Sequence, residues 1–384
     1  MYYNRFSKSR GSARRIKSFD PSYVINTPLK SGETIEYAIT HEFSDFAINE
    51  QLKRNILGKG YKIPTPIQDQ AIIPLLEGRD LIGIANTGTG KTAAFLIPLI
   101  DKVLKNPREQ VLIITPTREL AAQIRDEFVS FSRSLRIYCA LCIGGAGMRR
   151  QVQDLRYNPN FVIGTPGRIQ DLLRSRYLNL SNFRSIVLDE ADRMVDIGFV
   201  VDIKYIISLL PKARQSLFFS ATIDGKVREI LNSFVHNPVT ISVKTGDTAE
   251  NIQQETIRVF DRDKKIEQLH KLLIQKEFEK VLLFGRTKHG VQKLSDELVK
   301  RGFKADAIHG NKKQNQRTRT LEKFKNNQIQ ILLATDVASR GLDIPNVSHV
   351  INYDLPESYD AYIHRIGRTG RADKKGVALT FVGS

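Results

Sequence analysis

The feature that most constrains the fold is a regular alternation of two patterns, which begins near residue 40. Short runs rich in Val, Ile, Leu and Phe alternate with longer stretches of helical period, such as Glu119 to Phe131. Strands that alternate with helices form a parallel, doubly wound α/β sheet. In the first half of the chain we predict strands at Leu81–Ile84, Val111–Thr115, Phe161–Gly164, Ile186–Leu188 and Leu217–Phe219.

A polar stretch from Lys244 to Asn251 interrupts the alternation and is typical of a linker. The chain has 384 residues, enough for two domains of roughly 150–200 residues each. We therefore expect an extension over residues 1–40, a first lobe over 41–243, a linker over 244–252 and a second lobe over 253–384. In the second lobe we predict strands at Val281–Phe284, Ala305–His309, Ile329–Ala334, Val350–Tyr353 and Val377–Phe381.

The chain is strongly basic, with 59 Lys and Arg against 41 Asp and Glu and a net charge of +18. This balance favours a polyanionic partner, nucleic acid first and an anionic membrane second. No apolar run approaches the ~18 residues of a membrane span. The first 18 residues hold six basic residues, no acid and no apolar signal core. A basic arm that touches RNA is favoured over a transit peptide, which composition also allows.

The two cysteines, Cys139 and Cys142, stand in a C-x-x-C spacing. A zinc site needs two further ligands at matching spacing, and none is nearby. A redox pair is conceivable, but we favour two small apolar residues in a strand from Ile137 to Ile143. A disulfide framework is excluded, which fits a reducing cytosol.

Ligands of open α/β sheets bind at the carboxyl ends of the strands, where the polar clusters of this chain fall. The loop Ala85–Thr92, hereafter the phosphate loop, follows the first predicted strand. Gly88 and Gly90 allow backbone N–H groups to surround phosphate oxygens, aided by the dipole of the following helix. Lys91 would reach the β/γ-phosphates and the Thr92 hydroxyl would hold Mg²⁺. Ala85 replaces the first glycine of the usual pattern.

An acidic pair, Asp189 and Glu190, follows another apolar strand. Asp189 suits a Mg²⁺ contact, and Glu190 suits a base that orients the attacking water. Alone, such a pair is more often a helix cap. Together with the phosphate loop it favours catalysis.

A late arginine cluster holds Arg368 and Arg371, separated by Gly370. A cation on the developing charge of γ-phosphate hydrolysis is worth roughly 10³–10⁵ in rate. The alternative is a solvated basic loop, but the glycines favour a loop pressed against a ligand or another lobe. Because these arginines lie far from the phosphate loop along the sequence, we expect them to belong to a different lobe. Hydrolysis should then require that the two lobes meet. Earlier in the chain, the Gln68 amide could hold adenine N6 and N7 and so select ATP.

With these motifs in order over residues ~40 to 384, the chain closely resembles the DEAD-box ATP-dependent RNA helicases. The resemblance implies two tandem RecA-like lobes, ATP with Mg²⁺, and Lys91, Asp189, Glu190, Arg368 and Arg371 as catalytic residues. It implies metal contacts by Thr92 and Asp189. It implies nucleotide contacts by Phe43, which would pack on adenine, and by Thr65, Gln68, Ala85, Asn86, Thr87, Gly88, Thr89, Gly90, Lys91, Thr92, Gly341 and Asp343.

The resemblance also implies a coupling element and an RNA-binding surface. Hydrolysis would be coupled to unwinding through Asp192, Ser220, Thr222 and His364. RNA, as a single strand or short duplex with little sequence specificity, would be bound by Pro116, Thr117, Arg118, Glu119, Gly144, Gly145, Thr165, Gly167, Arg168, Arg286, Thr287, Gly310, Arg317, Thr335 and Arg340. We expect a cytoplasmic monomer with possible protein partners. Family members usually continue past the point where this chain stops, so it can be part of a longer protein.

Three other functions are open on sequence. A DNA translocase uses the same two lobes, although the Asp-Glu-Ala-Asp quartet and Gln68 speak against it. An ATP-dependent RNA clamp shares every motif with an unwinding enzyme. A non-enzymatic RNA-binding protein would need neither Glu190 nor Arg371.

Overall fold

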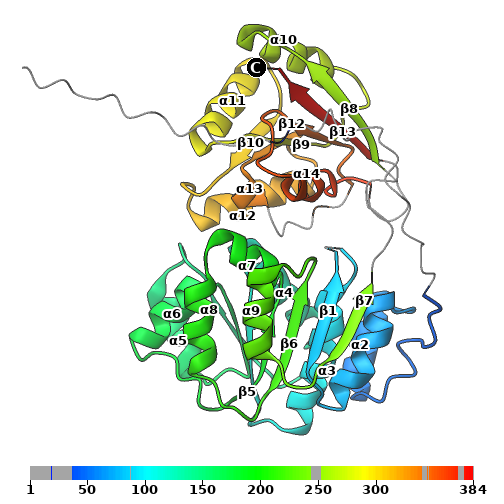
Figure 1. The fold of residues 1–384 in the computed structure, drawn as a ribbon, viewed down its shortest axis with the longest axis vertical. Coiled ribbons are helices and arrows are strands. Elements are labelled where there is room, and N and C mark those ends of the chain that lie inside the picture. The colour runs from blue at the N-terminus through cyan, green and yellow to red at the C-terminus, as the bar shows by residue number, and fades with distance from the viewer. Residues whose placement is uncertain are drawn as a thin grey trace, which may run out of the picture.

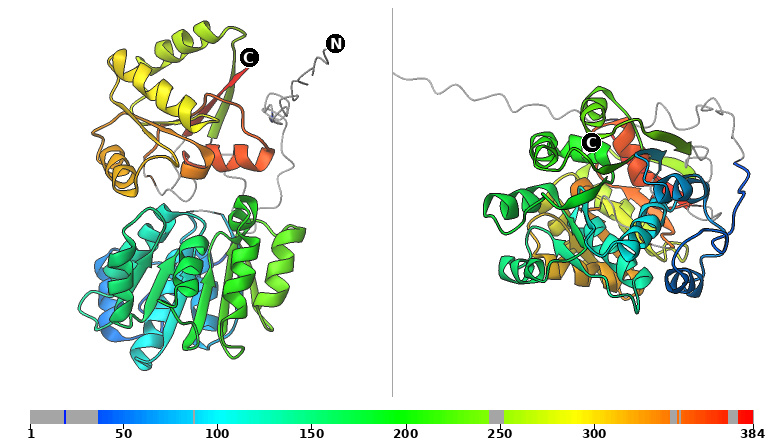
Figure 2. Two further views of the ribbon diagram at one scale, coloured as in Figure 1. Left: turned by 90° about the vertical axis from the view of Figure 1, so that its left-hand side faces the viewer. Right: turned by 90° about the horizontal axis from the view of Figure 1, so that it is seen from below.

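The computed structural model describes residues 19, 37–86, 88–243, 252–339, 344, 346–370 and 376–383. Five residues with roles predicted above lie outside these ranges, as do residues 244–251 of the predicted linker and nearly all of the first 36 residues. The five are Thr87, Arg340, Gly341, Asp343 and Arg371. Figures 1 and 2 show two lobes, one above the other.

Lobe 1 is built on a seven-stranded sheet in which every described pairing is parallel. The strands run in the order β3-β4-β2-β5-β6-β1-β7. They are β1 Leu81–Ala85, β2 Gln110–Ile114, β3 Cys139–Cys142, β4 Phe161–Gly164, β5 Phe183–Leu188, β6 Gln215–Ser220 and β7 Val239–Val243.

Helices cover both faces of this sheet. One face is covered by α1 Glu50–Gly58, α2 Pro66–Leu76, α3 Lys91–Lys105 and α4 Arg118–Phe131. The other is covered by α5 Met148–Arg156, α6 Pro166–Arg174, α7 Ala191–Ile197, α8 Val200–Ser208 and α9 Gly225–Phe234. Successive strand residues face opposite sides: Leu81 belongs to the first core and Ile82 to the second.

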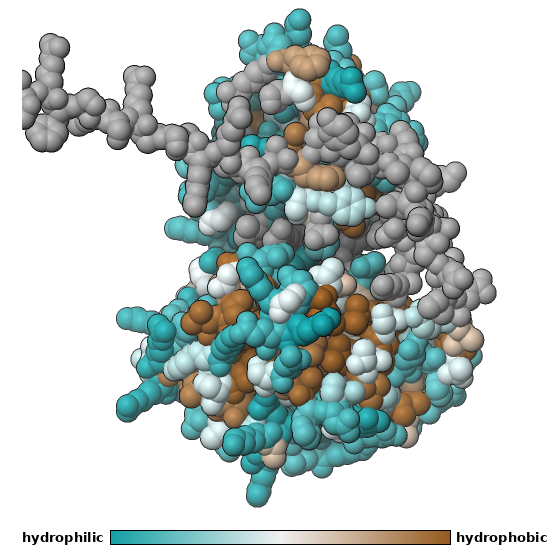
Figure 3. All heavy atoms as spheres, viewed as in Figure 1, coloured by the Kyte–Doolittle hydropathy of each residue, from teal (hydrophilic) through white to brown (hydrophobic). Residues whose placement is uncertain are grey.

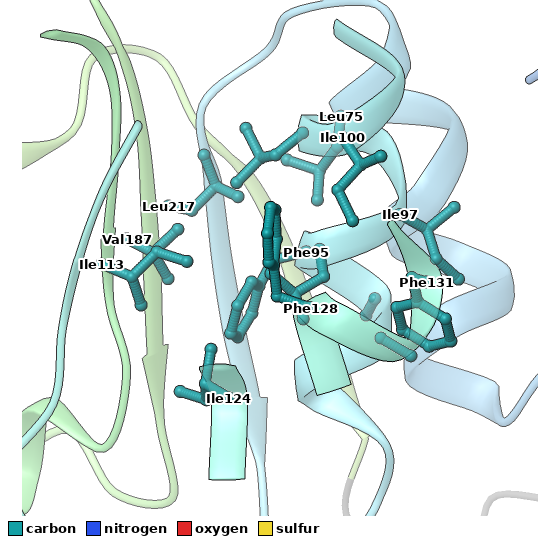
Figure 4. Close-up of a cluster of buried hydrophobic side chains, with 14 of the residues drawn as sticks. Leu75, Phe95, Ile97, Ile100, Ile113, Ile124, Phe128, Phe131, Val187 and Leu217 are labelled. Atoms are coloured by element: carbon teal, nitrogen blue, oxygen red, sulfur yellow. The ribbon is translucent and has the colours of Figure 1, made fainter. Parts of the chain in front are cut away.

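The core under α3 and α4 is dense in aromatic and branched side chains. Phe95 of α3 and Phe128 of α4 lie among Ile113, Val187 and Leu217 of the sheet (Figure 4). A sheet buried on both faces requires continuous apolar strands, and this explains why the central strands read as uninterrupted apolar runs.

Lobe 2 has a six-stranded sheet with parallel pairings in the order β10-β11-β9-β12-β13-β8. Its strands are β8 Ile252–Arg258, β9 Val281–Phe284, β10 Ala305–Ile308, β11 Ile331–Ala334, β12 His349–Asn352 and β13 Gly376–Val382. Its helices are α10 Arg262–Leu273, α11 Lys288–Lys300, α12 Gln314–Lys325, α13 Asp336–Ser339 and α14 Tyr359–Ile366. The predicted fold class, two doubly wound parallel lobes, is confirmed.

Two strands, β7 and β8, are not among those predicted. Each lies at the edge of its sheet and pairs with only one described neighbour. Both strands carry polar residues, two of five in β7 and five of seven in β8, because an edge strand is not buried on both faces. The two cysteines lie on β3, another edge strand, and both are free.

In the view of Figure 3, hydrophilic residues surround the edge of lobe 1, and hydrophobic residues lie between them across the middle of this face. Among the described residues, no helix is both long and apolar enough to cross a membrane.

Candidate active site and nucleic-acid interface

The order of the strands separates the predicted site residues into two groups. In lobe 1 the phosphate loop, Asp189 and Ser220 follow β1, β5 and β6, which are neighbours in the sheet. The RNA-binding residues predicted for lobe 1 follow β2, β3 and β4, which form the other half. Lobe 2 divides likewise, because its described RNA-binding candidates follow or flank β9, β10 and β11. The residues predicted to bind nucleotide and those predicted to bind nucleic acid therefore lie over different halves of the sheet in lobe 1.

The phosphate loop has the geometry expected from its glycines. Gly88 and Gly90 have φ values of 89° and 90°, a left-handed conformation that favours glycine. Lys91 begins α3, and its Nζ donates a 2.6 Å hydrogen bond to the carbonyl oxygen of Ala85 at the start of the loop. The lysine is thus held across the loop, where its charge faces the position of a bound phosphate.

Thr65 and Gln68 brace the phosphate loop from the start of α2. The Gln68 amide Nε2 donates to the Gly90 carbonyl at 3.0 Å, and Thr65 Oγ1 donates to the Thr89 carbonyl at 2.7 Å. A Cβ on Gly90 would lie 2.4 Å from the Gln68 nitrogen, so no larger residue fits there. These two side chains connect the predicted adenine-binding motif to the phosphate loop. Their contact with adenine stays a prediction.

Phe43 does not lie where adenine could reach it. Its side chain is 0% exposed and packs edge-on against Phe46 and Tyr61, with ring centroids 5.8 and 5.7 Å away. A ring enclosed in the core has no face for a base, so the predicted direct packing on adenine is wrong. The aromatic residue that lines the cavity beside the phosphate loop is Tyr61, which the sequence analysis missed. Its position directly after Gly60, inside the same motif, was the available signal.

The acidic pair lies at the tip of β5, next to the phosphate loop. Both carboxylates are buried, and Glu190 has a φ of 53°, which is uncommon for a residue with a side chain. Glu190 Oε2 accepts a 2.7 Å hydrogen bond from Arg193, which is buried as well. The sequence analysis also missed Arg193, although its i, i+3 spacing from Glu190 in a predicted helix could have indicated the pair.

Burial raises the pKa of the Asp189 carboxyl to about 7; Lys91 opposes the rise and the Glu190 carboxylate adds to it. The ordinary value is 3.8, so between these pH values the folded protein binds more protons than the unfolded chain. The free energy of unfolding therefore falls as pH rises through this range.

The substitution Asp189→Asn is expected to remove this loss of stability at higher pH, because an asparagine side chain cannot ionise. The variant keeps the oxygen that accepts from the Glu190 N–H at 3.0 Å. In nucleotide-free protein we expect its Tm to exceed that of the unmodified chain by a few degrees at pH 8, with little difference at pH 5. Thermal unfolding at both pH values measures this, and a difference that does not depend on pH contradicts it.

Both lobes contribute to one cavity of about 620 Å³. Lobe 1 supplies Lys91, Thr92, Asp189 and Glu190, and lobe 2 supplies Arg368. Arg368 follows α14, and its guanidinium Nε donates to the His364 carbonyl at 3.3 Å. The cavity is large enough for a nucleotide. Two oxygen donors at its wall, the Thr92 hydroxyl and the Asp189 carboxylate, are of the type that Mg²⁺ prefers.

A smaller pocket beside it joins the predicted coupling residues of both lobes. Its lining includes Lys91, Glu190 and Asp192 of lobe 1 and His364 of lobe 2. Asp192 Oδ2 accepts from the backbone N–H groups of Ala221 and Thr222, both at 3.1 Å. The segment after β6 is therefore fixed to the helix that follows the catalytic pair.

The predicted RNA-binding residues of lobe 1 form one compact group. The Arg118 guanidinium lies against the backbone of Gly144 and Gly145, where a Cβ on Gly145 would be 2.2 Å from Nη1. Arg168 Nη1 donates to the Ala146 carbonyl at 3.3 Å. Two arginines thus flank one glycine loop, an arrangement suited to a phosphate backbone. Pro116, Thr117, Thr165 and Gly167 lie at the same strand ends.

On lobe 2, Arg286, Thr287 and Gly310 are exposed at the ends of β9 and β10, and Thr335 follows β11. Arg317 differs from these, because it is buried and its Nη2 lies 2.8 Å from Glu119 Oε2 of lobe 1. Burial lowers the pKa of this guanidinium, and Glu119 opposes the shift. Gln314 Nε2 also donates to Glu119, at 3.0 Å. Two residues predicted to contact RNA therefore join the lobes in this structure.

Arg317→Met is expected to raise the RNA concentration that half-saturates ATP hydrolysis by about 10- to 100-fold. Removing one partner of a buried ion pair destabilises the closed state by about 3–5 kcal/mol, because the remaining charge stays buried without a partner. Opening of the lobes hydrates Glu119 and relieves part of this cost, so the closed state that binds RNA becomes less favourable. Adding Glu119→Gln should restore part of the loss, because no carboxylate is then buried on closure. RNA titrations of the two variants measure both effects. If Arg317 acts only through RNA, the second substitution restores nothing.

Comparisons with known proteins agree with this geometry. The DEAD/DEAH box helicase family matches residues 65–230, and the helicase conserved C-terminal domain matches residues 264–373. The chain is 43% identical over 343 residues to the ATP-dependent RNA helicase CshA of Limosilactobacillus reuteri. The matched stretch covers 89% of this chain and 69% of that protein. The chain is also 43% identical over 346 residues to the DEAD-box ATP-dependent RNA helicase CshA of Bacillus subtilis (strain 168), covering 90% and 70%.

Two solved structures extend the similarity to the arrangement of the lobes. S. cerevisiae Dbp5 bound to RNA and ADP BeF3 matches with a TM-score of 0.79 and 31% identity over 90% of each chain. Mss116p bound to ssRNA and AMP-PNP matches with a TM-score of 0.81 and 29% identity, over 96% of this chain and 77% of that one.

Proposed function

The chain belongs to the DEAD-box family of ATP-dependent RNA helicases, and we propose from this premise that it couples ATP hydrolysis to local RNA unwinding or remodelling of RNA–protein complexes. The observation that supports the coupling most directly is the shared cavity. Lys91, Asp189 and Glu190 reach it from lobe 1, and Arg368 reaches it from lobe 2. Hydrolysis then depends on closure of the lobes, and closure is what RNA can control.

Within the closed cavity, each of the lining side chains has a separate role in hydrolysis. Lys91 and the N–H groups of the phosphate loop hold the β/γ-phosphates. Glu190, oriented by Arg193, positions the attacking water and accepts its proton. Arg368 stabilises the charge that develops on the γ-phosphate. Thr92 and Asp189 would hold Mg²⁺, which neutralises phosphate charge when bound.

RNA is held by its backbone across the other half of the sheets. Arg118 and Arg168 on lobe 1 and Arg286 and Thr287 on lobe 2 would contact phosphate and 2′-OH groups, and such contacts carry little sequence information. ATP and RNA stabilise the same closed arrangement, so each raises the affinity for the other by the same factor. Closure bends one strand and its partner dissociates; hydrolysis and product release then reopen the lobes.

Several further expectations belong to this proposal. Gly341, Asp343 and Arg371 would complete the nucleotide site, as the family resemblance implies. The protein would act as a cytoplasmic monomer, since one chain supplies both halves of the site and its two cysteines are free.

The test is steady-state ATP hydrolysis without nucleic acid, with single-stranded RNA, and with a DNA oligonucleotide of equal length. Strong stimulation by RNA alone supports the proposal. Equal stimulation by DNA would indicate a translocase instead. Duplex release from a short RNA hairpin under ATP then separates unwinding from clamping, and full release by Lys91→Ala contradicts the assignment.

A further inference from the structure

One described residue of the N-terminal extension, Phe19, is placed against lobe 2. The backbone N–H of Phe19 donates a 2.7 Å hydrogen bond to the carbonyl oxygen of Pro356. The Phe19 ring meets Tyr359 edge-on at 5.6 Å and Tyr362 at 6.2 Å between centroids. A backbone hydrogen bond together with two ring contacts is a specific docked geometry.

The surface that receives Phe19 is an apolar cluster built on α14, β8 and β13. Its buried members are Ile252, Tyr362, Ile366 and Ala378. The Tyr362 hydroxyl donates to Gln254 Oε1 at 2.8 Å, which fixes the ring that Phe19 meets. Phe19 therefore extends a small core that α14 shares with the two strands.

Residues of α14 also line the smaller pocket between the lobes. Ile363 packs against the cluster that holds Phe19, and it also lines the pocket with His364, Gly367 and Lys91. Arg368 lies just beyond the end of this helix. Phe19 and the pocket thus contact the same two-turn helix, and Ile363 belongs to both surroundings.

A second explanation is that the stretch from Phe19 to Tyr37 acts as a strap that limits how far the lobes separate, and it fits the chain lengths less well. The Tyr37 hydroxyl donates to the Ser242 carbonyl on β7, so the chain does return to lobe 1. The stretch from Phe19 to Tyr37 is, however, about twice as long as that from Val243 to Ile252. The longer connection cannot limit lobe separation more than the shorter one does. Support of α14 is the effect that remains.

We propose that Phe19 is a positioning residue, an internal ligand of lobe 2 that holds α14 where His364 and Arg368 complete the nucleotide site. This inference rests on the proposed ATPase function. Loss of Phe19 is expected to lower kcat more than it raises KM for ATP, because lobe 1 supplies the phosphate loop. The expected decrease in kcat is about 2- to 30-fold.

Docking is tested without any activity measurement. The chain contains no tryptophan, so Phe19→Trp introduces a single fluorescent reporter, and Phe260→Trp on the same lobe provides an exposed reference at a residue that is 82% exposed. We expect acrylamide to quench the Phe19→Trp variant several-fold less than the Phe260→Trp variant, and an added Tyr359→Ala to remove that protection. Equal quenching of the two reporters in otherwise unchanged chains overturns the docking.

Positioning is tested with Phe19→Ala, Phe19→Leu and the matched control Phe260→Ala. RNA-stimulated kcat should fall in the first, recover most of its value in the second and stay unchanged in the third. An unchanged kcat in Phe19→Ala, with the Phe19→Trp reporter protected in the quenching experiment, overturns the positioning role. If the unmodified chain shows no RNA-stimulated hydrolysis, the proposed function fails, while the quenching result still decides the docking.

Discussion

Replacing Arg368 by alanine is expected to lower kcat for ATP hydrolysis by about 10³–10⁵, the range for loss of an arginine that stabilises the transition state. Arg368 is one of two lobe 2 cations, with Lys325, that line the cavity shared with Lys91 and Asp189, and it is buried. ATP affinity should change far less, because the phosphate loop belongs to lobe 1. Single-turnover hydrolysis with saturating RNA, paired with equilibrium nucleotide binding, measures both quantities.

Two further variants test whether the loss of kcat is specific to the Arg368 guanidinium. Arg368→Lys should recover only part of the rate, because a lysine lacks the planar fork of donors. Arg258→Ala, at an exposed arginine on β8 of the same lobe, should leave kcat unchanged. A decrease smaller than tenfold in Arg368→Ala, or an equal loss of ATP affinity, would contradict the assignment of Arg368 to the transition state.

Glu190→Gln should lower kcat by about 10²–10⁴, the contribution usual for a positioned general base. Glutamine keeps the shape of the side chain and an oxygen that can accept from Arg193, which is 2.7 Å from the carboxylate. The local structure and the binding of ATP and RNA should therefore persist while proton transfer fails. The same single-turnover assay measures the loss.

The exposed Glu77 offers a matched control, because Glu77→Gln makes the same chemical change away from the cavity. We expect it to hydrolyse ATP at the unmodified rate. Retention of more than a tenth of the activity by Glu190→Gln would show that another group activates the water.

The sequence predicted what depends on local pattern and missed what depends on tertiary placement. Strands at the sheet centres were found because burial on both faces makes them continuously apolar, whereas β7 alternates and β8 is mostly polar, and both were missed. Composition could not distinguish the buried Phe43 from Tyr61, which reaches the cavity, because both are aromatic residues of one motif.

The pair between Glu119 and Arg317 shows the same limit. Both residues were predicted only as RNA contacts, whereas their contact with each other joins the two lobes and depends on how those lobes meet. No local pattern encodes that relation. The pair between Glu190 and Arg193, in contrast, lies within one helical turn, so its spacing in the sequence could have predicted it.

If nucleotide and RNA bind over different halves of each sheet, as proposed, this arrangement also determines how the two ligands can arrive. Because they sit over different strands, neither obstructs the path of the other, and steady-state kinetics should follow a random order of addition. A small molecule lodged at Arg118 and the Gly144–Gly145 loop would then compete with RNA. Toward ATP it would act as a noncompetitive or mixed inhibitor, so raising the nucleotide concentration would not overcome it.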